Sequence, residues 1–247
     1  DKDGDEKYQP KEIPLEGVYP KPAFGDQLKD FQVFMGGFDI DNKVAYLYAA
    51  SHKEARNILF QANFETGTLN NLYESMYGGY PTGYSADHSK VAISEGYTMG
   101  DTVLYLWDKN TLQTKRLIGV PLEKREPGQD VPLNNIHSVQ FVEDDQAIIF
   151  NTTLIEDKGS LGYLKLDDSG EVEEVEIRGL QHKGEGEMGA LEHLTGNRYS
   201  LAYNIDGVDW VYEGTYDESL QVFELENVLV GQGELANGVL EHISYEK

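Results

Sequence analysis

The sequence predicts an all-β fold: a β-propeller of four-stranded antiparallel blades, with about four complete blades and one composite or partial blade. A polar turn closed by a long polar residue returns five times, at intervals of 47 to 56 residues. Short runs of β-branched or aromatic residues follow the first four of these turns. Repeats of this length with four strands each are typical of propeller blades. The closing residues of the turns are Lys43, Lys90, Gln146, Arg198 and Lys247.

Each run that follows a polar turn is expected to form the second strand of a blade, because it is short, β-rich and bounded by polar residues. These runs lie at residues 44–48, 91–94, 147–150 and 199–203. A third strand follows after a hairpin, and its period-two alternation indicates one packed face and one solvated face. We place the third strands at residues 57–60, 103–107, 161–166 and 220–225.

A tight turn then leads into a fourth strand, as at residues 114–117 and 172–177. Gly67 and Gly170 stand in this turn, where a hairpin needs a positive φ. Asn110 takes the corresponding place in the second complete repeat, and Asn tolerates that conformation best after Gly.

No domain boundary is evident, so we expect residues 1–247 to form a single propeller segment. The chain stops where a further repeat should start, and we therefore expect a fragment of a larger propeller. A tail strand at 238–247 is able to supply the missing first strand of the opening blade, whose third strand we place at residues 8–15. The approximate blades are 1–28 (partial), 33–75, 80–118, 136–178, 188–230 and 238–247 (partial).

The chain is strongly acidic, since 44 Asp and Glu stand against 20 Lys and Arg and give a formal net charge of −24. Such a field repels nucleic acid and anionic membranes, so neither is an expected partner. There are no cysteines, which excludes disulfides, thiol nucleophiles and Cys-ligated metals. No apolar run reaches the length of a membrane span. The chain begins at Asp1 without a signal pattern, so we expect its biological N-terminus to be missing; the lack of cysteine favours the cytoplasm without fixing the compartment.

Two local motifs resemble functional sites but lack the context these need. Asp1-Lys2-Asp3-Gly4-Asp5 with Glu12 is acidic like a calcium loop, yet its Gly stands at position four, where an EF-hand loop needs it at six. We interpret it as an acidic hairpin turn. Gly83-Tyr84-Ser85-Ala86-Asp87 resembles the G-x-S-x-G nucleophile elbow, but it ends in Asp and no helix is expected after it, so we reject it as catalytic.

Histidines and paired carboxylates give no further site. None of the six histidines is spaced as a metal-binding pair, and His193 and His242 take the same place in successive repeats, which indicates a structural role. Glu173-Glu174 and the pair Glu185 and Glu187 are interpreted as solvated surface. We therefore expect no catalytic residue, no cofactor and no metal in this chain.

The stretch from residue 204 to residue 219 is interpreted as the longest hairpin of the repeats. Its aromatic residues lie at the end of a blade, where a loop either packs its own side chains or faces a partner or substrate. The residues concerned are Asn204, Asp206, Trp210, Tyr212 and Tyr216.

The order of several motifs resembles that of the prolyl-oligopeptidase-like serine hydrolases of acylaminoacyl or dipeptidyl peptidase type, with TolB-type propellers as wider relatives. Ser85-Ala86-Asp87-His88 and the segment 38–43 are similar to the S-P-D-G-K turn of these propellers. The opening at 1–9 with the turn at 13–17 resembles their first blade, and 203–207 resembles a later N-x-D-G hairpin. Ala86 replaces the usual Pro and His88 the usual Gly.

The resemblance implies a non-catalytic propeller that caps and gates the active site of an α/β-hydrolase domain outside this chain. Peptide or small-ester substrates would be reached through that domain, which is the implied partner. The catalytic triad belongs to the hydrolase domain, so no catalytic residue is carried over, and the double-Glu motif of dipeptidyl relatives is not assigned to Glu173-Glu174. Two alternatives remain open: a stand-alone propeller that binds a protein or small ligand, and a five-bladed glycosidase.

Overall fold

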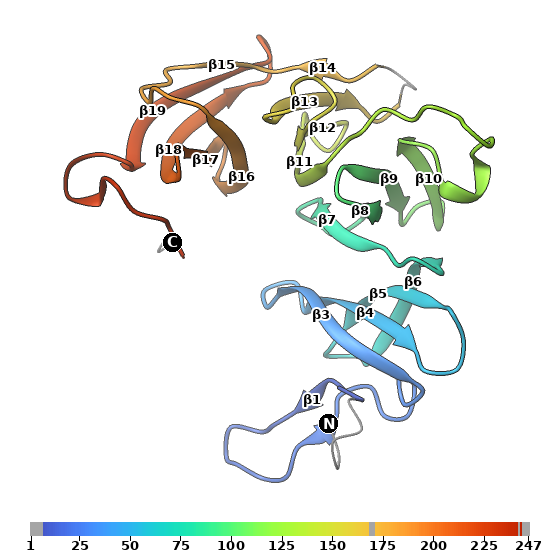
Figure 1. Ribbon diagram of the computed structural model, residues 1–247. Coiled ribbons are helices and arrows are strands. Elements are labelled where there is room, and N and C mark those ends of the chain that lie inside the picture. Colours follow the sequence, from blue (N-terminus) through green and yellow to red (C-terminus); the bar gives the residue numbers. More distant parts are fainter. Residues whose placement is uncertain (1–6, 168–170, 242, 244–247) are drawn as a thin grey trace. The chain divides into compact units, whose positions relative to one another are not determined.

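The computed structural model describes residues 7–167, 171–241 and 243, in which the regular secondary structure is almost entirely β-strand (Figure 1). Four sheets of at least four strands and one two-stranded hairpin are present, together with two short 3-10 helices, η1 (Leu122–Lys124) and η2 (Gly233–Leu235). The predicted all-β fold class is thereby confirmed. No helix in these ranges is long and apolar enough to cross a membrane.

The chain divides into two compact units. The first comprises Asp1–Thr98 and Val103–Lys124, and the second comprises Met99–Thr102 and Arg125–Lys247.

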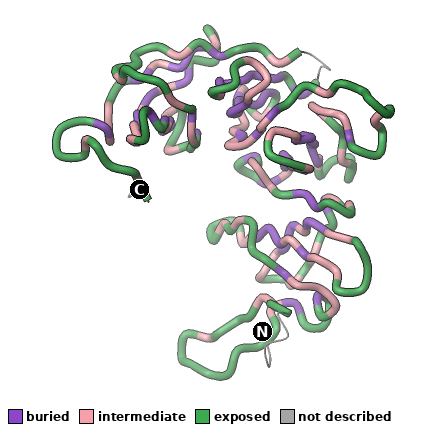
Figure 2. The backbone as a smooth tube through the Cα atoms, in the orientation of Figure 1, coloured by how far each residue is buried: buried purple, intermediate pink, exposed green. Residues whose placement is uncertain are grey.

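The first unit begins with an exposed hairpin of β1 (Lys11–Glu12) and β2 (Lys21–Pro22), shown mostly in green in Figure 2. Gly17 has φ +75°, as the predicted turn requires, although the strands on each side are only two residues long. The first sheet follows with antiparallel neighbours in the order β3 (Phe31–Asp39), β4 (Val44–Ser51), β5 (Asn57–Asn63) and β6 (Thr68–Ser75). The second sheet has the order β7 (Tyr80–Tyr84), β8 (Lys90–Thr98), β9 (Asp101–Asp108) and β10 (Gln113–Ile118).

Buried side chains of the two sheets form the core of this unit. Tyr46 and Leu59 of the first sheet pack with Ile93 and Tyr105 of the second. The other face of the first sheet is covered by Phe24 and its neighbours in the segment before β3. The middle strands are the most buried, as expected for strands paired on both edges, and they carry the purple segments of Figure 2.

The second unit contains the third and fourth sheets. The third has the order β11 (Ile136–Val142), β12 (Ala147–Thr152), β13 (Ser160–Lys165) and β14 (Glu173–Glu174). The fourth has the order β15 (Glu176–Arg178), β19 (Val222–Val230), β18 (Val208–Asp217), β17 (Arg198–Ile205) and β16 (Gly186–Thr195). Their facing side chains form one core, in which Ile149, Tyr163, Leu201 and Phe223 are buried.

The single outer strand predicted at residues 172–177 is wrong, because two short strands stand there. β14 pairs antiparallel with β13, and β15 pairs parallel with β19 of the neighbouring sheet. Val175 lies between β14 and β15, is 2% exposed and belongs to the shared core. Burial of this side chain therefore marks the point at which the chain passes from one sheet to the next.

The fourth sheet also corrects two predicted elements. Residues 208–217 form the ten-residue strand β18, so the long hairpin predicted from 204 to 219 is in fact a turn of two residues, Asp206 and Gly207. Both have positive φ, as a tight two-residue hairpin turn needs. The third strand predicted at 220–225 is instead the beginning of the fourth strand, β19.

The turn before the outer strand is longer than predicted. The N–H of Gly67 donates to Asn63 O, and the N–H of Leu112 donates likewise to Asp108 O. The positive φ falls on the last residue of this turn, which is Gly67 in the first sheet, as predicted, but Leu112 rather than Asn110 in the second. Gly170, the expected pairing of 238–247 with the opening blade and the acidic motif at 1–5 lie wholly or partly outside the described residues.

Candidate functional site

The turn that enters β8 is held by its own side chains. Ser85 is fully buried, and its hydroxyl donates to Asp87 Oδ1 (2.8 Å) while accepting the N–H of Lys90 (2.9 Å). Asp87 Oδ1 also accepts the N–H of Ser89 (2.9 Å). Hydrogen bonds from Ser89 lower the pKa of Asp87 to about 2. These contacts place the next residue, His88, at φ +56°.

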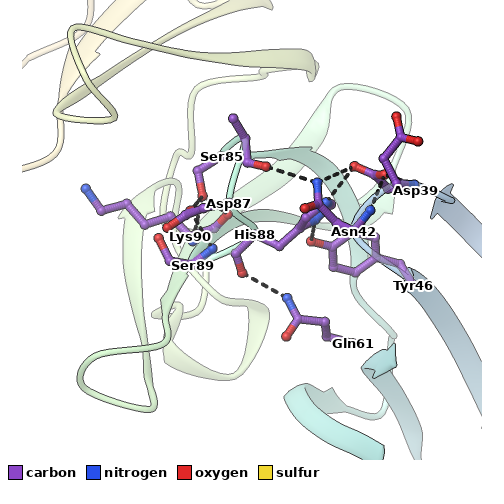
Figure 3. Close-up of polar contacts among 11 residues, drawn as sticks. Asp39, Asn42, Tyr46, Gln61, Ser85, Asp87, His88, Ser89 and Lys90 are labelled. Atoms are coloured by element: carbon purple, nitrogen blue, oxygen red, sulfur yellow. Dashed lines mark hydrogen bonds and ion pairs between the residues drawn. The ribbon is translucent and has the colours of Figure 1, made fainter. Parts of the chain in front are cut away.

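His88 connects this turn to the first sheet (Figure 3). Its Nε2 lies 2.9 Å from Asp39 Oδ2 and its Nδ1 lies 2.8 Å from the Tyr46 hydroxyl. With the proton on Nε2, the ring donates to the carboxylate and accepts from the phenol, so both nitrogens are satisfied. The ring also stacks on Tyr84, with centroids 4.6 Å apart. The backbone oxygen of His88 accepts a bond of 2.9 Å from Gln61 Nε2.

The surroundings of Asp39 and Tyr46 fix the protonation of these two groups at neutral pH. Asp39 accepts hydrogen bonds from the side chain and backbone of Asn42 and from His88, and these hold its pKa well below the ordinary 3.8. Burial raises the pKa of Tyr46 well above its ordinary value of 10. The carboxylate is therefore charged and the phenol is protonated.

An acid, an imidazole and a hydroxyl in line repeat the order of a catalytic triad, and triads are recognised by such geometry. Here the hydroxyl belongs to Tyr46, which is 1% exposed, and His88 is 3% exposed. No substrate reaches either group, and the buried Ser85 is equally inaccessible. The cluster joins the first and second sheets.

Sequence reasoning missed this cluster. The one local signal is the departure at position 88, where a bulky residue stands in a turn that resembles a Gly-containing one. A non-Gly residue in the left-handed backbone conformation is strained, and the strain persists only where other contacts of that residue compensate for it. Asp39 and Tyr46 provide these contacts.

The five residues singled out between 204 and 216 lie on two strands and their turn rather than in a long loop. Tyr212 and Tyr216 are core residues, 0% and 2% exposed, and Trp210 is half-buried with its ring stacked on that of Tyr212. They alternate along β18 as strand residues do, which is why they point into the core. Asn204 and Asp206 are exposed.

A cavity of about 540 Å³ brings one of these residues together with others in the second unit. Asn204 lines it and donates from Nδ2 to Asp209 Oδ1 (2.7 Å). Asp209 in turn holds the C-terminal segment, because its N–H donates to Gly238 O and its Oδ2 accepts the N–H of Leu240. Leu240 and Ile243 form a wall of the cavity. Asp206 and the three aromatic residues do not line it.

The remaining polar groups of the sequence analysis are surface or structural groups. His193 Nε2 lies 2.8 Å from Gly196 O and closes the turn before β17. Glu173 and Glu174 are exposed on β14, and Glu185 contacts Lys158. His242 lies outside the described residues. Within the described ranges, no three His, Asp or Glu side chains group as metal ligands would.

Solved structures of other proteins share this architecture. No family model and no curated protein sequence matches the chain. TolB from Acinetobacter baumannii matches 87% of this chain and 47% of its own, with a TM-score of 0.50 and 16% identity. The chain has a β-propeller fold.

Prolyl oligopeptidase B from Galerina marginata is similar to the same propeller. Its complex with a 25-residue macrocyclization substrate matches 76% of this chain and 26% of its own, with a TM-score of 0.54 and 9% identity. A second complex of that enzyme gives a TM-score of 0.52 at 11% identity. This propeller chain thus spans about half the length of TolB and a quarter of the oligopeptidase. At these identities the likeness establishes the fold.

Proposed function

We propose that this propeller is the non-catalytic region of a prolyl-oligopeptidase-like serine hydrolase, and that it caps and gates the active site of an α/β-hydrolase domain elsewhere in the same protein. The observation that carries the proposal is the similarity to prolyl oligopeptidase B over 76% of the chain. Peptides or small esters are the substrates, reached through the hydrolase domain.

The first unit has the rigidity that a cap needs. The contacts of His88 tie the second sheet to the first, and the Tyr46–Tyr84 and Tyr48–Tyr80 ring pairs stack with centroids 5.1 and 4.7 Å apart. Sheets fixed in this way hold their connecting loops firmly, which lets a cap exclude water and bulky substrates from a neighbouring site.

A fluorophosphonate probe tests the division of labour. This chain alone is expected to remain unlabelled, whereas the full-length parent is labelled at a serine outside residues 1–247. Labelling of a serine within the chain would overturn the proposal.

Gating is tested in the parent protein. Removal of the propeller is expected to raise hydrolysis of a long peptide relative to a small ester, because the cap filters by size. An unchanged ratio of the two rates would contradict gating while leaving the labelling result intact.

A stand-alone binding propeller is the second candidate, favoured by the TolB match, which covers more of this chain than the oligopeptidase match does. A parent protein without a G-x-S-x-G segment and later Asp and His would support it.

A further inference from the structure

A cavity of about 390 Å³ lies in the second unit, where β11, β12 and β16 meet the turn before β13. It is separate from the cavity at Asn204 and shares none of its lining residues. Its volume is in the range of small-molecule sites, which combine apolar walls with a few convergent polar groups. Met188 and Leu133 supply apolar wall.

The deepest polar group is the side chain of Asn151, which is 2% exposed. Its Nδ2 donates to the backbone oxygens of Met188 (3.2 Å) and Gly189 (2.6 Å), so the orientation of the amide is fixed. Both of these bonds use the nitrogen. No donor to its Oδ1 is found among the residues that the structure describes, and an acceptor left without a donor is a place for a ligand.

Gly159 keeps the space in front of this oxygen open. A Cβ at that position would lie 3.0 Å from Asn151 Oδ1 and 3.1 Å from Met188 Cβ. The backbone φ of +87° likewise favours Gly.

Three more uncharged polar side chains line the same cavity, Asn135, His137 and Thr153, and three charged ones also line it, Asp157, Lys158 and Glu187. Thr153 Oγ1 accepts the backbone N–H of Asn135 (2.8 Å), which leaves its own proton for another acceptor. His137 Nδ1 contacts Ser138 Oγ (3.1 Å). For the Asn135 amide and His137 Nε2, the described part of the chain provides no hydrogen-bond partner.

The charges around the cavity select against an anion. The second unit contains 27 Asp and Glu against 7 Lys and Arg, a difference of −20. Lys158 at the rim already contacts Glu185, while Asp157 and Glu187 are exposed to solvent. Burial lowers the pKa of His137, which favours the neutral ring. The inner groups are therefore two amides, a hydroxyl and a neutral imidazole.

We infer that this cavity is a binding site for a neutral polyhydroxylated ligand, a short saccharide or similar polyol. Amide, hydroxyl and imidazole groups both donate and accept, as hydroxyl-rich ligands require. The aliphatic walls suit the C–H faces of such a ligand. This assignment is independent of the proposed gating function.

The test is a titration of the ¹⁵N-labelled chain with maltose and with glycerol, followed by amide NMR. Shifts are expected at Gly159 and His137, with dissociation constants in the millimolar range typical of a few neutral hydrogen bonds. Glucuronate is expected to bind more weakly than glucose at low salt, since its carboxylate enters an acidic field. Tighter binding of protonated glucosamine than of glucose would overturn the neutral assignment, and no shift with any sugar would overturn the site.

Asn135→Ala removes a side-chain amide that makes no hydrogen bond to any residue that the structure describes. It is expected to weaken maltose binding about fivefold, the value of one neutral hydrogen bond, without lowering the melting temperature. Asn110→Ala in the first unit is the matched control, an exposed Asn that does not line the cavity, and is expected to bind as the unaltered chain does. Equal affinity of both variants would contradict the inference.

Discussion

The Nε2 group of His88 donates to the carboxylate of Asp39 over 2.9 Å and so links the turn before β8 to the last residue of β3. The two residues are 49 positions apart in the sequence. The contact couples two sheets through one side chain that occupies a backbone conformation usually left to glycine.

We expect His88→Ala to lower the free energy of unfolding by about 2 to 4 kcal/mol, because it removes the imidazole that bonds the buried Tyr46 hydroxyl and one of the donors to Asp39. His88→Gly is expected to cost about 1 kcal/mol less than the alanine variant, since Gly takes positive φ without strain. Urea denaturation of the three proteins checks this order. A glycine variant at least as stable as the unaltered chain would show that the two hydrogen bonds do not outweigh the strain.

Asp39 is expected to make stability depend on acid pH. Its folded-state pKa lies below the ordinary 3.8, so the charged form stabilises the fold fully above that value. The contribution is lost as the pH falls through 3.8 toward the lower folded-state pKa. Asp39→Asn should therefore be destabilising at neutral pH, with a smaller deficit near about pH 3.

Asp130→Asn is the control for this experiment, because Asp130 is exposed and has no hydrogen bond to other described residues. Denaturation at the two pH values should show no comparable change for that variant. A constant deficit for Asp39→Asn at both pH values would contradict the electrostatic origin.

Gly67 and Leu112 hold equivalent places before the outer strands of their sheets, with φ +70° and +55°. We expect Gly67→Ala to destabilise the chain by about 1 kcal/mol and Leu112→Gly to stabilise it by up to about 1 kcal/mol, because only Gly is unstrained there. Neither change meets a packing penalty, since a Cβ at position 67 has no atom within 4 Å and Leu112 is 75% exposed. Thermal unfolding of both variants measures the change in stability. Changes in the same direction for the two variants would contradict the equivalence of positions 67 and 112.

Val175→Ala should cost about 2 kcal/mol, from two methyl groups removed at a buried position between β14 and β15. Glu174→Ala, one residue earlier on an exposed strand, should change stability by less than about 0.5 kcal/mol. Chemical denaturation of the pair distinguishes them. Similar losses of stability in the two variants would mean that the path of the backbone from β14 to β15, rather than the valine side chain, determines the local stability.

The strands of the first three sheets could largely be predicted because their middle segments are short, rich in β-branched and aromatic residues, and stand between recognisable turns. In the fourth sheet the prediction is wrong at β18, because the alternating run at 220–225 is interpreted as the third strand and residues 204–219 as the hairpin before it. Pairing on both edges, to β17 and β19, makes it a strand. Local pattern carries no information about such partners.

The side-chain cluster at His88 lay beyond prediction for the same reason. Its partners stand 42 and 49 residues away, and nothing in the spacing of Asp39 or Tyr46 points to them. The turn at Leu112 was misplaced because the sequence shows which residues tolerate positive φ, whereas the hydrogen bond from Leu112 N–H to Asp108 O determines which residue has it.

The parallel pairing of β15 with β19 bears on how the chain is made. Glu176 is translated 46 residues ahead of its partner Val222. The strand β15 therefore has no partner in the fourth sheet while β16, β17 and β18 are translated, before β19 follows. Glu176 and Arg178 are charged and exposed, and charged side chains on an unpaired strand oppose its pairing with other chains. Completion of the fourth sheet is thus a late event in biosynthesis, which requires the arrival of β19, the strand between β15 and β18.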